Sequence, residues 1–390
     1  MDPVNNPYSP GAGNHPPALV GRETDLAHFN VVVKRLSIRN HDRSVIITGL
    51  RGVGKTVLLR EFGRIAERHR WIHNHVEVSE DTRFIVVITA MLRRSLLQLS
   101  RGKQLAKHVK AAMRVLKAFQ IRWELPEGIE IAAGIDPVAG SADSGLLDRD
   151  LADLFVAVGE LAQKSDRGVL LTIDEMQFLP KDALADLIMA LHEMSQLGLP
   201  FLIAGAGLPS LSSNVGDARS YAERLFEFRS IGRLDADGSA AALVQPAKKK
   251  GVRWDQAALK RVTMLTDGYP YFLQEFGKQI WFVANGPDVI CLDDVDSAVP
   301  LAIEKLDEGF FRVRYDRTTG AERGYLNAMA TLGTGDYASG DVAAAQRKTT
   351  AQVAVVRDAL IRKGLCYSPR HGVVAFTVPM FADYLRRHQT

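Results

Sequence analysis

One eight-residue run limits this chain more than any other segment: Gly49-Leu50-Arg51-Gly52-Val53-Gly54-Lys55-Thr56. A short, nearly all-apolar stretch at residues 44–48 precedes it, as expected for a buried parallel strand. Residues 55–68 follow with apolar side chains at helical spacing. A strand, a glycine-rich turn and a helix form the context that a phosphate-binding loop requires. The segment therefore predicts a nucleotide site.

Each residue type in this run has a mechanical reason. The glycines permit a tight loop and let backbone N–H groups approach phosphate oxygens closely. The helix beginning at Lys55 presents its positive end to the same phosphates. Lys55 can reach the β- and γ-phosphates, and the Thr56 hydroxyl can ligate Mg²⁺. We therefore expect ATP and Mg²⁺ as ligands, with binding residues Gly49, Gly52, Val53, Gly54, Lys55, Thr56 and Val57.

A pair of acidic residues, Asp174 and Glu175, ends the most apolar strand candidate of the chain, residues 168–173. Side chains at the carboxyl end of such a strand face the crevice in which open α/β sheets bind ligands. Asp174 is predicted to hold Mg²⁺, and Glu175 to orient and deprotonate the attacking water. A solvated acidic pair that opens a loop is the alternative, and the phosphate-binding loop in the same chain favours the catalytic interpretation.

The pattern along the chain predicts several parts. Residues 1–17, rich in Pro, Asn and Gly, are expected to be a disordered tail. Strands alternating with helices up to residue 235 predict a parallel sheet covered on both faces, with a hairpin insertion at about 119–147. Among the helices expected there are 148–164 and 217–224. Residues 236–315 look entirely helical, and 316–390 follow the order of a winged helix-turn-helix domain.

Composition excludes several other classes. The net charge is only +4, which does not argue for nucleic-acid binding by itself. The cysteines, Cys291 and Cys366, match no metal or redox spacing and are expected to be reduced core thiols. No apolar run approaches the ~20 residues of a membrane span, and the N-terminus lacks the apolar stretch of a signal peptide. We expect no membrane association and a cytoplasmic location.

These motifs together resemble the AAA+ superfamily of P-loop ATPases, and more narrowly its origin-recognition-like and STAND-type branch. The chain carries Leu19-Val20-Gly21-Arg22-Glu23, similar to the family element that sits against adenine. The resemblance implies an α/β fold in which a five-stranded parallel sheet is followed by a helical lid and a winged helix. Gly268-Tyr269-Pro270 is similar to the lid element of STAND-type proteins, in which the proline packs on the base. Val20, Gly21, Arg22 and Pro270 are thus added to the predicted binding residues.

Two departures from the family pattern concern catalysis. Residues 271–274 supply no arginine where relatives place their second sensor, and the end of the strand 200–204 lacks a polar first sensor. Both favour a slow nucleotide switch over a motor. The resemblance also implies an arginine finger that reaches a neighbouring subunit, for which Arg224 is the candidate. The alternative for Arg224 is a surface arginine paired with a nearby glutamate.

The role of the C-terminal segment has two interpretations. A winged helix inserts a helix into the DNA major groove. Here that helix would be 349–364, with contacts to double-stranded DNA from Arg347, Lys348, Gln352 and Arg370. Alternatively the domain packs against a protein partner, as in a STAND-like regulatory ATPase or one subunit of a larger complex. A homo-oligomer is compatible with either.

Overall fold

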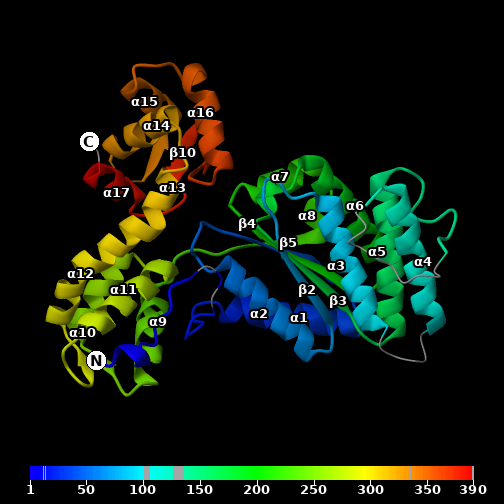
Figure 1. Ribbon diagram of the computed structural model, residues 1–390, viewed down its shortest axis with the longest axis horizontal. Coiled ribbons are helices and arrows are strands. Elements are labelled where there is room, and N and C mark those ends of the chain that lie inside the picture. The colour runs from blue at the N-terminus through cyan, green and yellow to red at the C-terminus, as the bar shows by residue number, and fades with distance from the viewer. Residues whose placement is uncertain (12, 14, 101–105, 126–135, 334, 389–390) are drawn as a thin grey trace.

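The computed structural model describes residues 1–11, 13, 15–100, 106–125, 136–333 and 335–388. Its described residues form three lobes (Figure 1). An α/β core lies to the right in that view, a helical lid at the lower left and a C-terminal lobe at the upper left. Among the described residues, no helix is long and apolar enough to cross a membrane.

The core is built on a five-stranded sheet in which every pairing is parallel, in the order β2-β3-β4-β1-β5. The strand that precedes the phosphate-binding loop is β1, and the strand that ends in the acidic pair is β3. They are separated by β4, as the family resemblance implied. The bounds are β1 (Ser44–Thr48), β2 (Ile72–Glu77), β3 (Val169–Asp174), β4 (Phe201–Gly207) and β5 (Phe226–Ser230).

Helices cover both faces of this sheet, as predicted (Figure 1). One face packs on α1 (Glu23–Ser37) and α2 (Lys55–Arg68). The other face packs on α3 (Phe84–Leu99), α5 (Leu147–Lys164) and α6 (Lys181–Gln196), with α4 (Ala106–Arg122) lying against α3 and α5. Two shorter helices, α7 (Leu211–Ala218) and α8 (Ala222–Leu225), lead into β5.

Two expectations for the core were wrong in the described residues. Residues 119–122 belong to α4 rather than to a hairpin strand, because Leu116 and Phe119 are fully buried at helical spacing. Residues 126–135 of the predicted insertion lie outside the described residues, and its other described residues, 123–125 and 136–146, form turns and loop. The helix expected at 217–224 is two helices, α7 and α8, separated at Arg219 by extended backbone.

The lid is helical, as predicted, with one addition. It comprises α9 (Ala236–Lys248), α10 (Gln256–Thr266), α11 (Pro270–Val283) and α12 (Leu292–Leu306). Two short parallel strands, β6 (Arg253–Trp254) and β7 (Val289–Ile290), join these helices. A π-helical turn (Asp307–Arg312) and α13 (Val313–Tyr315) continue α12 into the C-terminal lobe.

The C-terminal lobe packs four helices against a small antiparallel sheet of order β8-β10-β9. The helices are α14 (Gly320–Thr331), α15 (Ser339–Ala345), α16 (Thr350–Arg362) and α17 (Phe381–Arg387). The strands are β8 (Asp336–Ala338), β9 (Cys366–Tyr367) and β10 (Val373–Phe376), of which the sequence pattern predicted the last two. Cys366 is buried here, whereas Cys291 is exposed at the start of α12, which corrects the expectation of two core thiols.

The N-terminal segment differs most from its prediction as a disordered tail. The Met1 ammonium donates to Ala284 O at 2.6 Å, and the indole N–H of Trp281 donates to Asp2 O at 2.8 Å. Tyr8 is buried against the lid, with its hydroxyl donating to Leu243 O at 2.6 Å. Composition predicted disorder because it cannot register such anchors to residues more than 200 positions away.

Candidate functional site

The phosphate-binding loop is shaped by two glycines in left-handed conformations. Gly52 has φ +82° and Gly54 has φ +99°, a region that side chains other than glycine rarely occupy. Gly54 immediately precedes α2, so the backbone N–H groups at the start of that helix face the loop. The loop thus has the form of an anion-binding nest at a helix N-terminus.

Lys55 folds back onto this loop. It is 5% exposed, and its ammonium donates to Gly49 O at 3.0 Å and Leu50 O at 2.9 Å. Burial lowers the pKa of the ammonium, an effect that the carboxylates of Glu175 and Asp174 partly oppose. Carbonyl oxygens hold the ammonium at the place where phosphate oxygens would replace them.

The predicted metal residues lie together. The Thr56 hydroxyl donates to the carboxylate of Asp174 at 2.5 Å, although the two residues are 118 positions apart. Asp174 is 1% exposed, and its second oxygen accepts from the backbone N–H of Glu175 at 2.8 Å. A hydroxyl and a carboxylate side by side are hard oxygen ligands of the kind Mg²⁺ prefers. The donor set therefore fits the predicted ion.

Glu175 is held by two neighbours that the sequence analysis did not single out. Its carboxylate accepts a hydrogen bond from the Gln177 side-chain amide and lies 4.0 Å from the guanidinium of Arg51. The amide oxygen of Gln177 accepts from the Leu208 backbone N–H at 3.0 Å. Gln177 thus links the acidic pair to the end of β4, where the expected polar side chain is missing.

A cavity of about 470 Å³ opens beside these residues. Its walls come from the N-terminal segment, the loop 51–57, the start of α11 and the π-helical turn with α13. Five cationic side chains and two carboxylates line it, so the cavity suits a polyanion. These charged residues are Arg22, Arg51, Lys55, Arg60, Arg314, Glu77 and Glu175.

Most of the residues predicted to bind nucleotide line this cavity, and Gly21 and Gly49 lie next to lining residues. The predicted residues that line it are Val20, Arg22, Gly52, Val53, Gly54, Lys55, Thr56, Val57 and Pro270. Arg22 does more than form a wall. Its guanidinium donates to Val53 O at 3.2 Å and to Gly232 O at 2.6 Å, which ties the phosphate-binding loop to the segment after β5. Pro270 is the first residue of α11.

Arg224 lies away from the cavity. It is exposed in α8, directly before β5, and it borders a small cavity with Ser44, the first residue of β1. Since β1 and β5 are parallel, this is the end of the sheet opposite to the phosphate-binding loop. Arg224 is therefore not part of the site in its own chain.

The residues predicted to contact DNA lie on the C-terminal lobe. Arg347 and Lys348 are exposed before α16. The Gln352 amide oxygen accepts from the Thr349 backbone N–H at 2.9 Å and so caps that helix. Arg370 lies 3.8 Å from Asp336. The structure thus gives two of the four residues local partners within the lobe.

Comparison with known proteins supports the reading of the core. Residues 18–204 match the family model described as AAA ATPase domain. Residues 308–385 match a model described as a domain of unknown function. No curated protein sequence matches the chain.

Several solved structures are similar in fold. A Walker-type ATPase of Pyrococcus abyssi has 17% identity and a TM-score of 0.55, over 94% of this chain and 96% of that chain. The ORC1 protein of Aeropyrum pernix, solved in complex with DNA, has 15% identity and a TM-score of 0.48, over 97% and 95%. Cdc6p from Pyrobaculum aerophilum has 16% identity and a TM-score of 0.48, over 99% and 97%. The strand order and the phosphate-binding loop are those of a P-loop AAA+ fold, and residues 18–204, just under half of the chain, are similar to the AAA ATPase domain family.

Proposed function

We propose that this protein is a slow, ATP-dependent molecular switch whose nucleotide state sets the position and accessibility of the C-terminal lobe. The observation that carries the proposal is a direct contact between that lobe and the phosphate-binding loop. Gly364, in the turn after α16, has φ +65°, and an added Cβ there would lie 2.5 Å from the guanidinium of Arg51. Anything that moves Arg51 therefore acts on the C-terminal lobe.

In this proposal the nucleotide enters the cavity with its phosphates on residues 52–57. Lys55 exchanges its two carbonyl partners for phosphate oxygens. Thr56 and Asp174 would hold Mg²⁺, which supplies positive charge that polarises the terminal phosphate. Val20 and Pro270 form apolar walls for the base.

Glu175 is the proposed general base for the attacking water. In the structure Gln177 donates to Oε2 of this carboxylate, which also faces Arg51, and both contacts stabilise the unprotonated form of the proposed base. The end of β4, Ala206 and Gly207, offers no polar side chain to position the water. These features support slow turnover.

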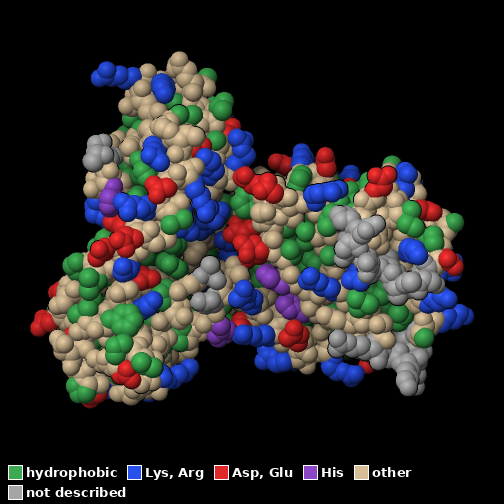
Figure 2. Space-filling model, viewed as in Figure 1, with side chains coloured by type: hydrophobic (Ala, Val, Ile, Leu, Met, Phe, Trp, Pro, Cys, Tyr) green, Lys and Arg blue, Asp and Glu red, His purple; other side chains and the backbone are tan. Residues whose placement is uncertain are grey.

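The C-terminal lobe has the element order of a winged helix, and double-stranded DNA is its proposed ligand. Helix α16 lies on the side of the lobe that faces the core (Figure 1). Figure 2 displays Lys and Arg side chains on the side of the C-terminal lobe that faces the core, and Asp and Glu side chains on the core opposite them. Opposite charges favour closure of the lobes. A nucleotide-driven opening would widen the space in which duplex DNA can approach the exposed side chains of Arg347, Lys348 and Arg370.

A protein partner is the second candidate, and the exposed face of α16 favours it. That face carries Val355, which is 75% exposed, and Asp358 next to the partly cationic end of the helix. An apolar residue at its centre and an acidic one beside it suit a protein surface better than a phosphate backbone.

The two candidates are separated by fluorescence anisotropy of labelled duplex DNA. The Glu175→Gln protein is titrated with and without ATP at two salt concentrations. ATP-dependent binding that weakens with salt supports the DNA switch, because phosphate contacts release counterions. The double variant Arg347→Gln with Lys348→Gln should then lose affinity, whereas Lys107→Ala with Lys110→Ala on the distant α4 should not. Absence of binding in both nucleotide states would favour the protein partner.

Arg224 enters the proposal only through assembly. Because it lies at the opposite end of the sheet from the site of its own chain, it can act on a nucleotide only in a neighbouring subunit. In a homo-oligomer, Arg224→Ala should reduce turnover at high protein concentration and have little effect in dilute protein.

A further inference from the structure

Two arginines from distant parts of the chain line the nucleotide cavity, and among the described residues the only carboxylate paired with either of them is that of Glu175, 4.0 Å from Arg51. Arg51 belongs to the phosphate-binding loop, and Arg314 belongs to α13, between the lid and the C-terminal lobe. Both line the cavity. Two positive charges close together in a partly buried place raise the free energy of the folded protein. An anion bound between them would lower it.

The contacts of Arg314 leave its charge uncompensated. Its guanidinium lies 3.8 Å from the centre of the Phe310 ring and donates to Phe310 O at 2.5 Å, one turn earlier in its own helix. It forms no ion pair within the part of the chain that the structure describes. Burial lowers the pKa of Arg314, and the neighbouring charge of Arg51 adds to this.

Arg51 is similarly short of partners. Its Nε is buried and has no hydrogen-bond partner among the described residues. Its nearest carboxylate is that of Glu175, at 4.0 Å. On its other side the guanidinium packs against the Gly364 backbone of the C-terminal lobe. Since Glu175 is the proposed base, Arg51 lies at the end of the cavity where the terminal phosphate would be.

We propose that Arg314 and Arg51 form a cationic clamp for the terminal phosphate of the nucleotide. Both arginines belong to the chain that binds the nucleotide, and neither lies in α11, the helix that begins at Pro270. This inference rests on the proposed function, and it names the residues by which that switch distinguishes a triphosphate from a diphosphate. The clamp is a positioning device: Arg314 holds the phosphate, and Glu175 remains the group that acts on water.

The π-helical turn supplies the connection to the C-terminal lobe. Arg314 lies directly after this turn, and Phe310 within it packs between Tyr271 of the lid and Arg314, with a ring distance of 4.7 Å to Tyr271. Phe311 in the same turn stacks on Phe381 of the C-terminal lobe at 5.7 Å. Movement of Arg314 toward a phosphate would therefore be passed to both neighbours through packed rings.

The test compares the affinities of a non-hydrolysable ATP analogue and of ADP, each with Mg²⁺, by calorimetry on the full chain. Arg314→Met keeps an unbranched side chain over Phe310 and removes the charge. We expect it to lower the affinity for the ATP analogue by about 10- to 100-fold, which corresponds to the loss of a charge-assisted hydrogen bond. ADP affinity should change by less than about threefold. Arg314→Lys should recover part of the loss.

Arg312→Met is the matched control, because Arg312 is exposed two residues earlier and borders a different cavity. It should leave both affinities unchanged. Thermal unfolding without nucleotide shows whether Arg314→Met folds, and Arg314→Lys supplies a second variant if it does not. If the variants weaken both nucleotides equally, or neither, the clamp is disproved. If the wild-type protein binds neither nucleotide, the proposed function itself fails.

Discussion

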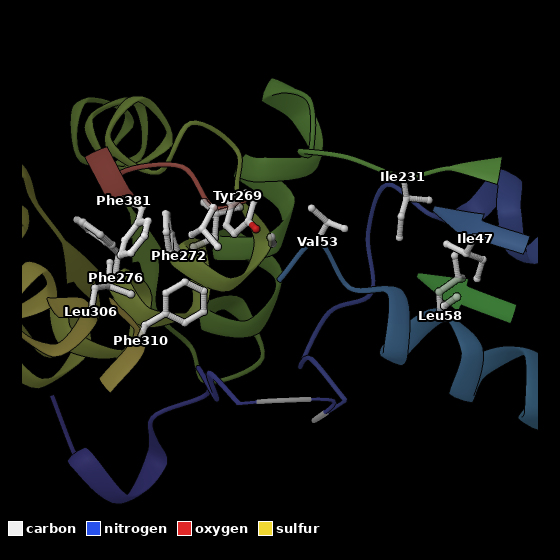
Figure 3. Packing of buried hydrophobic residues seen from close by; sticks show 14 of the residues in the cluster. Ile47, Val53, Leu58, Ile231, Tyr269, Phe272, Phe276, Leu306, Phe310 and Phe381 are labelled. Carbon is white, nitrogen blue, oxygen red and sulfur yellow. The ribbon is translucent and has the colours of Figure 1, made fainter. Parts of the chain in front are cut away.

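The two faces of the central sheet are buried in different ways. On the face of α3, α5 and α6, one hydrophobic cluster contains only core residues, from Ile46 to Phe228. On the face of α1 and α2, the cluster continues past Val53 and Tyr269 into the lid and ends in the C-terminal lobe at Phe381 and Leu385 (Figure 3). The nucleotide cavity lies on the second cluster, where Val53 and Phe310 line its wall.

In the proposed switch, the first cluster would be the fixed scaffold and the second would be the part that rearranges. The closed cluster can hold the strands in register whatever the lid does. The continuous cluster joins three lobes through a few large side chains, and packed interiors change arrangement in discrete steps rather than deform smoothly. Substitutions on the two faces should therefore have different consequences for nucleotide binding.

The largest effect is expected for Phe155→Ala on the closed face. Phe155 is fully buried with its ring 4.9 Å from that of Phe201, so its truncation should cost about 3–5 kcal/mol of unfolding free energy. Nucleotide affinity of the folded fraction should not change. Phe310→Ala on the continuous face is the matched variant and should lower both quantities. Urea denaturation and calorimetry measure them, and an affinity loss in Phe155→Ala would contradict the division.

Lys55→Ala should lower nucleotide affinity and leave the free energy of unfolding nearly unchanged, the reverse of Phe155→Ala. Loss of the ammonium should weaken ATP binding on the order of 100-fold or more, because a charge in a partly closed site interacts strongly with phosphates. Stability should change little, since only two carbonyls lose a partner. Lys107→Ala on α4 is the control. Unchanged ATP affinity in calorimetry would remove the site assignment.

Tyr8→Phe tests whether the N-terminal segment is part of the continuous unit. The change removes the hydroxyl that donates to Leu243 O and accepts from the Trp254 indole at 2.9 Å. Leaving these buried groups unpaired should cost about 1–3 kcal/mol. Ser9, Pro10 and Gly11, which follow Tyr8 closely, line the cavity, so ATP affinity should also fall several-fold. Tyr221→Phe is the control variant. If protease cleaves the N-terminal segment equally fast in both variants, Tyr8 does not anchor this segment to the lid.

The smallest effect concerns the C-terminal lobe alone. Burial raises the pKa of Glu322, but hydrogen bonds from Lys363 at 2.7 Å and from the Thr319 backbone outweigh it, and the net shift is downward. A lowered pKa stabilises above the unfolded value of about 4.3, and this is lost as pH falls through the folded pKa. Glu322→Gln should therefore cost about 1–2 kcal/mol at pH 7 and less at pH 3, which lies below the unfolded pKa.

Urea denaturation at both pH values measures this difference. Glu160→Gln, in an exposed pair with Lys164, should change stability by well under 1 kcal/mol at either pH. A loss for Glu322→Gln that is equal at pH 7 and pH 3 would show that the carboxylate charge is irrelevant.

Local pattern was sufficient for much of this molecule. The apolar run before Gly49 and the helical spacing after Lys55 predicted β1, the loop and α2 within a residue. Local pattern failed for 119–122, where alternating apolar residues suggested a strand and contact with neighbouring helices selected a helix. It failed also for the N-terminal segment, where Met1, Asp2 and Tyr8 have partners in the lid.

By itself, the sequence determined the glycine loop and the helix start on which the proposed phosphate site rests, because eight consecutive residues encode both. The same is true of Asp174 and Glu175, which follow directly from the end of a buried strand. Only the tertiary structure decided that Gln177 links Glu175 to Leu208, that Tyr8 reaches Leu243 in the lid, and that Arg51 contacts Gly364 and lines one cavity with Arg314. Those contacts join residues up to several hundred positions apart, and no spacing along a chain encodes a meeting that the packing of three lobes brings about.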